Sequence, residues 1–93
     1  MKQSFICPCF NEENNVIAFA KAVLDAFPNT KDYELVFIND GSRDNTIGSL
    51  KKLKKESTQN IKIINFSRNF GKESAMYAGL QNCKGDYITC LLY

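Results

Sequence analysis

The sequence predicts an α/β fold in which a doubly wound parallel sheet lies between two layers of helices, a three-layer arrangement. Short apolar runs alternate along the chain with stretches whose apolar residues recur at helical spacing, in the order βαβαβαβ. The apolar runs are continuous rather than alternating, which is typical of strands covered on both faces. Because crossovers between parallel strands are right-handed, we expect the strand order 3-2-1-4, with a switch point between strands 1 and 4.

The first half of the chain supplies two strands and the helix between them. The first strand is expected at residues 4–7, where an apolar run stops at Pro8. Apolar residues at helical spacing predict a helix over residues 12–27, which Pro28 ends. A second apolar run predicts a strand over residues 34–39. The predicted helix thus connects two parallel strands.

The second half repeats this alternation. A second helix is expected after Asp44, which suits an N-cap or a first-turn acid. A third strand is expected at residues 61–66, and a third helix opens at residues 71–72 and closes at residues 84–85. The last apolar run predicts a fourth strand over residues 86–92.

Length and composition indicate one folded domain over residues 1–93. The chain is 44% hydrophobic and 24% charged, close to average globular usage. Twelve Lys and Arg against ten Asp and Glu give a net charge of +2, which is too balanced to indicate a nucleic-acid partner. The sequence contains neither the ~20 apolar residues of a membrane span nor a signal peptide, so we expect a cytoplasmic protein. It contains no His, which excludes His-based triads and His-ligated metal sites in this chain.

The four cysteines are expected to be buried, reduced thiols. Cys7 and Cys9 form a CxC pair, but Cys83 and Cys90 do not repeat that spacing, so we expect no zinc site. A disulfide framework would need a secreted context, which the sequence does not indicate.

Ligands bind such sheets beyond the carboxyl ends of the strands, at the switch point. The loop after the first strand places Phe10 beside Asn11, Glu12 and Glu13. An aromatic ring there can stack on a nucleobase, and a carboxylate can accept from a base N–H or a ribose hydroxyl. The alternative is structural: Phe10 packs on the first helix and Asn11 caps it.

The loop after the second strand begins with a carboxylate. Asp40 ends an apolar strand, where an acid can contact a base edge or the ribose hydroxyls, and Gly41 permits a tight turn. The alternative is a plain turn in which Ser42 and Asp44 cap the second helix. We favour a binding role for Asp40.

The loop after the third strand carries two cations. Arg68 and Lys72 flank Asn69 and Gly71 just before a helix N-terminus. Cations beside free backbone N–H groups predict a diphosphate site. The alternative is a surface ion pair of Lys72. Neither the GxGxxG nor the GxxxxGK[ST] motif is present, and the lysines around Leu53 are expected to form a solvated face.

Together the three loops resemble a known family. Residues 6–13 (ICPCFNEE), 37–44 (FINDGSRD) and 67–73 (SRNFGKE) are similar to segments of the family 2 GT-A glycosyltransferases. The third segment most resembles the subgroup of polyprenyl-phosphate sugar transferases, relatives of the bacterial bactoprenol glucosyltransferase and of dolichol-phosphate mannose synthase. The resemblance covers essentially the whole chain, in order, as the N-terminal half of a Rossmann-like GT-A domain.

The resemblance implies binding of a UDP- or GDP-linked sugar. Pro8, Phe10 and Glu12 would hold the base and ribose, and Asp40 would contact one of the two. The cationic side chains of the third loop would lie near the diphosphate or the acceptor phosphate. The seven nucleotide-sugar-binding positions implied are Pro8, Phe10, Glu12, Asp40, Ser42, Arg68 and Lys72.

The resemblance also implies a metal-assisted reaction, but this chain lacks the motif that binds the metal. Members of the family transfer the sugar to a polyprenyl phosphate with inversion, helped by Mg²⁺ or Mn²⁺ on an acidic DxD motif after the fourth strand. Residues 86–93 read DYITCLLY and carry neither metal aspartate. We therefore expect a truncated donor-binding part that holds no metal or catalytic residue and is inactive alone. Its fourth strand would be an apolar edge through which copies self-associate.

Two alternatives remain open at this point. One is a non-catalytic α/β remnant that folds by self-association. The other is a receiver-like signalling module in which Asp40 accepts a phosphoryl group.

Overall fold

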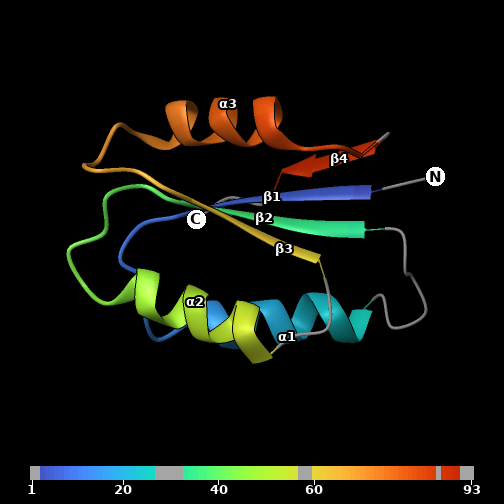
Figure 1. Ribbon diagram of the computed structural model, residues 1–93, viewed down its shortest axis with the longest axis horizontal. Coiled ribbons are helices and arrows are strands. Elements are labelled where there is room, and N and C mark those ends of the chain that lie inside the picture. Colours follow the sequence, from blue (N-terminus) through green and yellow to red (C-terminus); the bar gives the residue numbers. More distant parts are fainter. Residues whose placement is uncertain (1–2, 27–32, 57–59, 86, 91–93) are drawn as a thin grey trace.

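The computed structural model describes residues 3–26, 33–56, 60–85 and 87–90. All strand pairs are parallel, and the sheet order is β3-β2-β1-β4, which confirms the predicted order 3-2-1-4. Helices α1 and α2 cover one face of the sheet and α3 covers the other, as predicted for three layers (Figure 1). The elements are β1 (Gln3–Cys9), α1 (Val16–Ala26), β2 (Tyr33–Asn39), α2 (Thr46–Glu56), β3 (Asn60–Asn65), α3 (Lys72–Asn82) and β4 (Tyr87–Cys90).

The core has two parts because successive side chains of a strand point to opposite faces of the sheet. On β2, which is buried along its whole length, Leu35 and Phe37 face α1 and α2. Val36 and Ile38 face α3, where they join Ile6 of β1 in a second cluster. Continuous apolar runs are therefore needed, since both faces of the central strands are covered.

The first strand does not stop at Pro8, contrary to the prediction. β1 continues to Cys9, and Pro8 lies opposite Ile38 in the parallel register. The N–H of Asp40 donates to the carbonyl of Cys9 at 2.8 Å, so Cys9 faces β2 and Pro8 faces the β4 side. Within the described part of the chain, pairing with β4 ends at Ile6. The missing N–H of Pro8 therefore removes no hydrogen bond to β2.

The first helix begins later than predicted. Residues 13–15 form a turn, and α1 starts at Val16 rather than at Glu12. The carbonyl of Glu12 accepts from the N–H groups of Asn15 and Val16, both at 3.0 Å. The N–H of Glu12 donates to the Thr46 hydroxyl at 2.9 Å, so this segment is bound to the next loop before the helix starts. The predicted end at residue 27 lies outside the described residues.

The other boundaries shift by one or two residues. β2 and β3 each begin one residue before their predicted start, and β3 ends at Asn65. α3 starts at Lys72 as predicted but ends at Asn82, so residues 84–85 are not its terminators. β4 covers Tyr87–Cys90, and residues 86 and 91–92 of the predicted strand lie outside the described residues.

The thiols of Cys7 and Cys9 are buried, whereas Cys83 is half-buried. Burial, together with the negative charge of Glu12, raises the pKa of the Cys9 thiol to about 12. This thiol is therefore protonated at neutral pH and is a poor nucleophile. Each described helix has eleven residues, and none is long and apolar enough to cross a bilayer.

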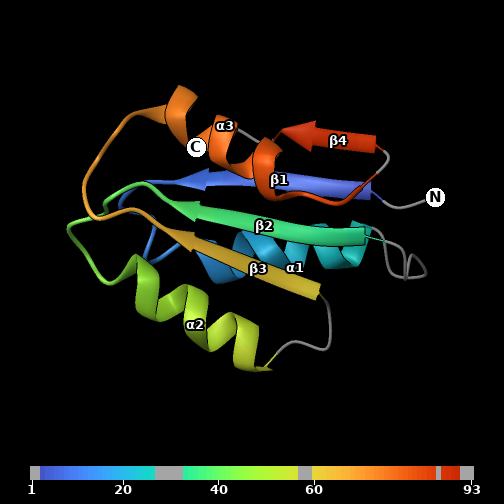
Figure 2. The same cartoon turned by 45° about the horizontal axis from the view of Figure 1, so that its top comes forward.

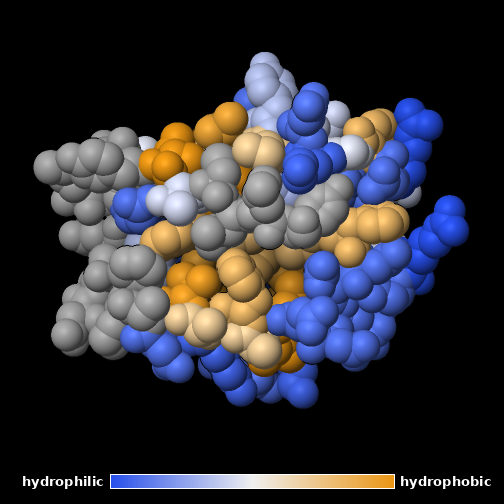
Figure 3. All heavy atoms as spheres, turned by 180° about the vertical axis from the view of Figure 1, so that it is seen from behind, coloured by the Kyte–Doolittle hydropathy of each residue, from blue (hydrophilic) through white to orange (hydrophobic). Residues whose placement is uncertain are grey.

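Apolar side chains lie exposed on the α3 side of the molecule. Tyr77 and Leu80 of α3 and Ile88 of β4, which we call the α3–β4 patch, are 61%, 45% and 45% exposed. Ile88 lies opposite Ser4 in the register, so its side chain projects from the same face of the sheet as Ile6 and α3. In the view from behind, hydrophobic atoms reach the surface in the upper part of the molecule, which holds α3 and β4 (Figure 3).

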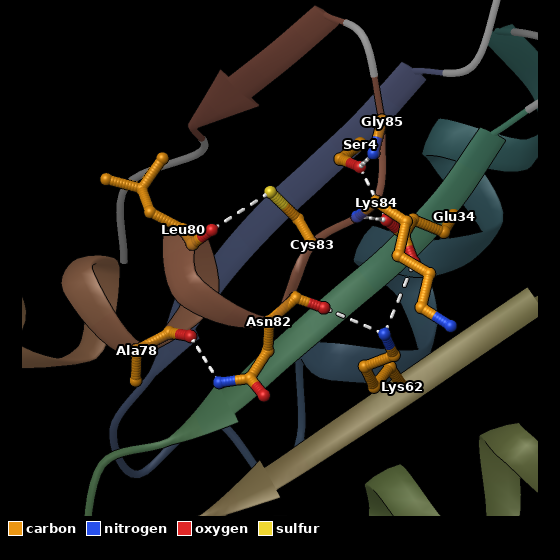
Figure 4. Close-up of polar contacts among 9 residues, drawn as sticks. All are labelled: Ser4, Glu34, Lys62, Ala78, Leu80, Asn82, Cys83, Lys84 and Gly85. Carbon is orange, nitrogen blue, oxygen red and sulfur yellow. Dashed lines mark hydrogen bonds and ion pairs between the residues drawn. The ribbon is translucent and has the colours of Figure 1, made fainter.

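A buried carboxylate ties the amino ends of the strands to the connection between α3 and β4. Glu34 of β2 is fully buried, and its Oε2 accepts from the Ser4 hydroxyl and from the N–H of Lys84, both at 2.6 Å. Its Oε1 lies 3.7 Å from the Nζ of Lys62, which also donates to the carbonyl of Asn82 at 2.8 Å (Figure 4). A cation there complements the partial negative charge at the carboxyl end of α3.

Candidate functional site

Three loops meet beyond the carboxyl ends of the central strands. They are loop 1 (residues 10–15), loop 2 (residues 40–45) and loop 3 (residues 66–71), which follow β1, β2 and β3. Because the strands are parallel, all three loops leave the same edge of the sheet, as both ribbon views show (Figures 1 and 2). The switch point between β1 and β4 lies beside them.

Asn11 joins loop 1 to loop 2. Its backbone has a φ of 55°, in the left-handed region that Asn tolerates better than most residues. Its N–H donates to the Ser42 hydroxyl at 2.9 Å, and its side-chain Oδ1 accepts from the N–H of Arg43 at 2.8 Å. Asn11 is therefore a bridge between loops and not the cap of the first helix.

Acidic side chains add a second connection between these loops. Glu13 accepts from the N–H of Asn45 at 2.9 Å. Asp44 accepts from the N–H of Thr46 at 3.0 Å, from the Thr46 hydroxyl, and from the N–H of Glu13 at 3.2 Å. The hydrogen bond from the Thr46 hydroxyl, helped by those backbone N–H groups, holds the pKa of Asp44 below its ordinary value. Asp44 thus binds the N–H of the first residue of α2, but it lies one residue before the N-cap and not, as predicted, at the N-cap or in the first turn.

Amide side chains connect the ends of β2 and β3. Asn39 and Asn65 are paired in the register, and the Nδ2 of Asn39 donates to the Oδ1 of Asn65 at 2.8 Å. The Ser42 hydroxyl donates to the Oδ1 of Asn39 at 2.5 Å. The Ser42 hydroxyl thus links the strand ends to Asn11 of loop 1.

Asp40 connects loop 2 to loop 3. It is fully buried, and its Oδ1 accepts from the N–H of Phe70 at 2.8 Å. Its Oδ2 accepts from the N–H of Gly71 at 3.1 Å and from the Nδ2 of Asn69 at 3.2 Å. The backbone N–H groups predicted to be free for a diphosphate are therefore bound to Asp40. The reason is that loop 2 lies directly against the start of α3.

Gly41 allows the two loops to approach this closely. Its φ is 65°, and an added Cβ would lie 2.1 Å from the backbone carbon of Arg68 and 2.2 Å from the backbone nitrogen of Asn69. Both atoms belong to the main chain of loop 3, so no rotation of a side chain would relieve this overlap.

Loop 3 carries a cation on an aromatic support. The guanidinium carbon of Arg68 lies 4.6 Å from the centroid of the Phe70 ring. Phe70 in turn meets Phe66 edge to face, with ring centroids 5.4 Å apart. Arg68 and Lys72 are both exposed, and Lys72 is the first residue of α3. The loop therefore presents two positive charges to solvent beside a fixed aromatic pair.

The structure thus brings the three predicted segments to one edge of the sheet. Asp40 and Ser42 belong to the hydrogen-bond network, whereas Pro8 is buried within β1. Phe10 and Glu12 are half-buried at the start of loop 1.

The residues that sequence reasoning missed are mainly amides. Two of them, Asn39 and Asn65, are the last residues of β2 and β3, and the other two lie within loops 1 and 3. These residues are Asn11, Asn39, Asn65 and Asn69.

The acids of this edge do not form a cation site. Among the described residues, no group of three or more His, Cys, Asp or Glu side chains is placed to hold a metal ion. The nearby carboxylates accept hydrogen bonds from the protein, as in Glu12, whose Oε2 accepts from the Nδ2 of Asn15 at 3.0 Å. The Mg²⁺ or Mn²⁺ that the family resemblance implies therefore finds no fitting donor set in the described residues.

Comparison with known proteins agrees with this architecture. Residues 4–91 match the family model described as glycosyl transferase family 2. The chain is 42% identical over 92 residues to a putative glycosyltransferase, CsbB, of Bacillus subtilis, covering 95% of this chain and 28% of that protein. It is 44% identical over 90 residues to a prophage bactoprenol glucosyl transferase homolog of Escherichia coli, covering 95% of this chain and 29% of that protein.

A solved structure gives the same fold. The crystal structure of Staphylococcus aureus TarS, residues 1–349, matches with a TM-score of 0.84 and 24% identity over 99% of this chain and 27% of that one. The chain thus spans less than a third of the length of these proteins.

Proposed function

The chain belongs to glycosyl transferase family 2, and from this premise we propose that it is the donor-binding part of a sugar transferase. We propose that it binds a nucleotide-diphosphate sugar, linked to UDP or GDP, at the carboxyl edge of its sheet. The observation that carries the proposal is the joining of loops 1, 2 and 3 by hydrogen bonds at that edge, in the segments that resemble the family.

The base and ribose are assigned to the loop 1 side of this edge. Phe10 is half-buried there and offers a ring face on which a base can stack. Glu12 lies two residues later with a carboxylate that can accept from a base or ribose hydroxyl. Pro8 supports this segment from within β1, and Ser42 fixes loop 2 beside it.

The diphosphate is assigned to loop 3. Arg68 and Lys72 supply positive charge, and guanidinium groups bind phosphate oxygens through two parallel N–H donors. The backbone N–H groups at the start of α3 are bound to Asp40, so the side chains carry this role.

Our proposal for the acceptor concerns a full-length protein of the size of the relatives, of which this chain spans less than a third. Related proteins are named bactoprenol glucosyl transferases. We therefore propose a polyprenyl phosphate as the acceptor and a cytoplasmic location for the donor site.

Calorimetric titration with UDP and GDP, with and without Mn²⁺, tests the donor site. We expect one of the two nucleotides to bind with a stoichiometry of one and without requiring Mn²⁺, because the described residues offer no cation cluster. Absence of binding by both nucleotides, for a chain whose circular dichroism spectrum shows that it is folded, would refute the proposed function.

We also propose that copies of the chain associate through β4. Among the described residues β4 pairs only with β1, and the α3–β4 patch lies beside this edge. Sedimentation equilibrium should show dimers that Ile88→Lys weakens, whereas Lys52→Glu on the exposed face of α2 should not. A chain that stays monomeric at high concentration would contradict this interface.

A further inference from the structure

We propose that Glu34 is a positioning residue, whose hydrogen bonds hold β4 in its register with β1 and so set the level at which β4 meets the carboxyl edge of the sheet. The proposal rests on the function proposed above and deepens it, because it adds β4 to the elements that shape the donor site. It gives the buried carboxylate at the amino end of β2 a role beyond stability.

β4 borders the edge at which the donor is proposed to bind. It lies beside β1 and runs parallel to it, so its carboxyl end points to the edge that holds loops 1–3 (Figure 2). The last pair of the register is Ile6 with Cys90, and β1 continues for three residues beyond Ile6 before loop 1 begins. A shift of β4 by one position would move its carboxyl end by about 3.3 Å relative to loop 1.

The pairing of β4 with β1 specifies this position only weakly. Among the described residues β4 has one neighbouring strand and pairs with it at four positions. Ile88 is 45% exposed and Thr89 is exposed, so these side chains gain little from one register over another. The hydrogen bond from the Nε2 of Gln3 to the Thr89 hydroxyl, at 2.6 Å, is also exposed. The register therefore depends on contacts made before the strand begins.

Those contacts converge on Glu34. Its Oε2 accepts from the Ser4 hydroxyl and from the N–H of Lys84, both at 2.6 Å. The Ser4 hydroxyl oxygen in turn accepts from the N–H of Gly85 at 2.8 Å. Ser4 and Glu34 are fully buried and stand side by side in the register of β1 and β2. The connection between α3 and β4 is thus bound to a fixed point on the two central strands (Figure 4).

Gly85 allows the connection to lie directly against β1. An added Cβ would stand 2.4 Å from the hydroxyl oxygen of Ser4 and 2.7 Å from its backbone nitrogen. The second of these atoms belongs to the main chain of β1, so rotation of the Ser4 side chain would not relieve the overlap. A slip of the connection along β1 would separate this pair and break the hydrogen bond between them.

The cation of the cluster acts on a different element. The Nζ of Lys62 lies 3.7 Å from the Oε1 of Glu34 and donates to the carbonyl of Asn82 at the end of α3. The Lys62 side chain is 33% exposed, so water screens this ion pair. Because the ion pair uses Oε1 and the bonds to Ser4 and Lys84 use Oε2, substitution can separate the two.

A comparison of Glu34→Gln with Glu34→Ala tests the role without any ligand. Gln retains a carbonyl oxygen that can accept from Ser4 and Lys84 but loses the negative charge, whereas Ala loses both. We expect backbone NOEs between β1 and β4, such as those of the pair Phe5 and Thr89, to persist in Glu34→Gln and to be lost in Glu34→Ala. If the two variants behave alike, the register does not depend on this acceptor and the proposal is wrong.

Amide exchange measures the size of the effect. The amides of Lys84 and Gly85 should exchange at least ~10-fold faster in Glu34→Ala than in Glu34→Gln. The amide of Phe37, in the fully buried strand β2, reports global unfolding and corrects for the lower stability of the Ala variant. An equal increase at all three amides would show that the substitution lowers global stability alone, and this would overturn the proposal.

Ser4→Ala serves if Glu34→Ala does not fold. It removes the acceptor for the N–H of Gly85 and leaves Glu34 and Lys62 in place. We expect the amide of Gly85 to lose protection by about 10-fold and the NOEs between β1 and β4 to weaken. Lys62→Met is the control, which removes only the cation and should leave both readouts at their wild-type values. If Lys62→Met releases Gly85 as strongly as Ser4→Ala does, the ion pair sets the position of β4 and the proposal fails.

Binding and transfer distinguish this proposal from the proposed function. Ser4→Ala should bind UDP or GDP within about 2-fold of the wild type, because Ser4 lies at the opposite edge from loops 1–3. In a full-length protein of the size of the relatives, Ser4→Ala should lower kcat about 10-fold and leave the KM for the donor within about 2-fold, because β4 then meets the site at the wrong level. An unchanged kcat would refute the role of β4 at the donor edge. Absence of nucleotide binding by the wild type would refute the proposed function and leave the ligand-free measurements valid.

Discussion

A fully buried carboxylate lies near each end of β2, and the two differ in the groups that they contact. Glu34 and Asp40 both stand on or next to β2, and both are fully buried. Glu34, near the amino end of the strand, faces the cation of Lys62 and bonds to β1 and to the connection before β4. Asp40, at the carboxyl end, accepts hydrogen bonds from loop 3, whose residues 67–70 are exposed.

This difference separates a structural carboxylate from one that serves a site. A buried carboxylate that accepts hydrogen bonds between fixed strands contributes to stability chiefly because its removal leaves those donors unsatisfied. A buried carboxylate bonded to an exposed loop instead holds that loop against the neighbouring one. The two acids should therefore fail in different assays, Glu34 in unfolding and Asp40 in binding.

Glu34→Ala should give the largest loss of stability. It removes the acceptor for the Ser4 hydroxyl and the Lys84 N–H and leaves Lys62 without its carboxylate, so we expect the free energy of unfolding to fall by about 3 kcal/mol. Urea denaturation measures it. Glu56→Gln, on the exposed end of α2, is the control and should stay within about 0.5 kcal/mol of the wild type. A loss below about 1 kcal/mol for Glu34→Ala would show that Glu34 is not the structural carboxylate described here.

Gly41→Ala should come next, at about 2 kcal/mol, because it forces a Cβ into the backbone of loop 3 at a positive φ. Urea denaturation measures the loss. Lys52→Ala, on the exposed face of α2, is the control and should stay within about 0.5 kcal/mol of the wild type. A loss below about 1 kcal/mol for Gly41→Ala would mean that the backbones of loops 2 and 3 are not in close contact.

Arg68→Ala should change binding and leave stability nearly as it is. Its guanidinium is exposed and its contact with Phe70 is worth about 0.5–1 kcal/mol, whereas loss of a phosphate contact should weaken nucleotide binding roughly 10-fold. Lys52→Ala removes an equal charge from the exposed face of α2 and should leave the affinity unchanged. If both variants weaken nucleotide binding to the same extent, the loss at Arg68 reflects the net charge of the protein and not a contact at loop 3.

The smallest effect concerns pH. Hydrogen bonding lowers the pKa of Asp44, so its contribution to stability is complete above its ordinary pKa and is lost as the pH falls through the lower, folded-state value. Asp44→Asn lacks this contribution at every pH. The difference in unfolding midpoint between the two proteins should therefore be constant near neutrality and shrink below about pH 4. A difference that persists to strong acid would show that the charge of Asp44 plays no part.

Much of the fold could be predicted from the sequence, because apolar runs with helical stretches between them leave few topologies. The order β3-β2-β1-β4 follows from the handedness of crossovers. The prediction that the first strand stops at Pro8 was wrong. A missing N–H removes a hydrogen bond between strands only where the residue faces a paired strand, and the register decides which strand it faces. The start of α1 was misjudged because Glu12 bonds to Thr46, a residue distant in sequence.

The location of the site could be predicted from the sequence, whereas most of the hydrogen bonds within it could not. The segments with Phe10, Asp40 and Arg68 had to meet if the strands were parallel. Which groups bond across the loops depends on side chains that meet only in the folded chain, such as Asp40 with the N–H groups of Phe70 and Gly71. The same contacts leave Asp40 without the exposed oxygen that the receiver-like alternative requires.

Backbone amide chemical shifts during titration with the nucleotide that binds test the central claim most directly, namely that loops 1–3 form a donor site. The amides of Asn11, Arg43 and Phe70, one from each loop, should shift together and saturate at one concentration. The amides of Lys84 and Gly85, beside Glu34, should not move. Shifts confined to that opposite edge, or to only one of the three loops, would contradict the account.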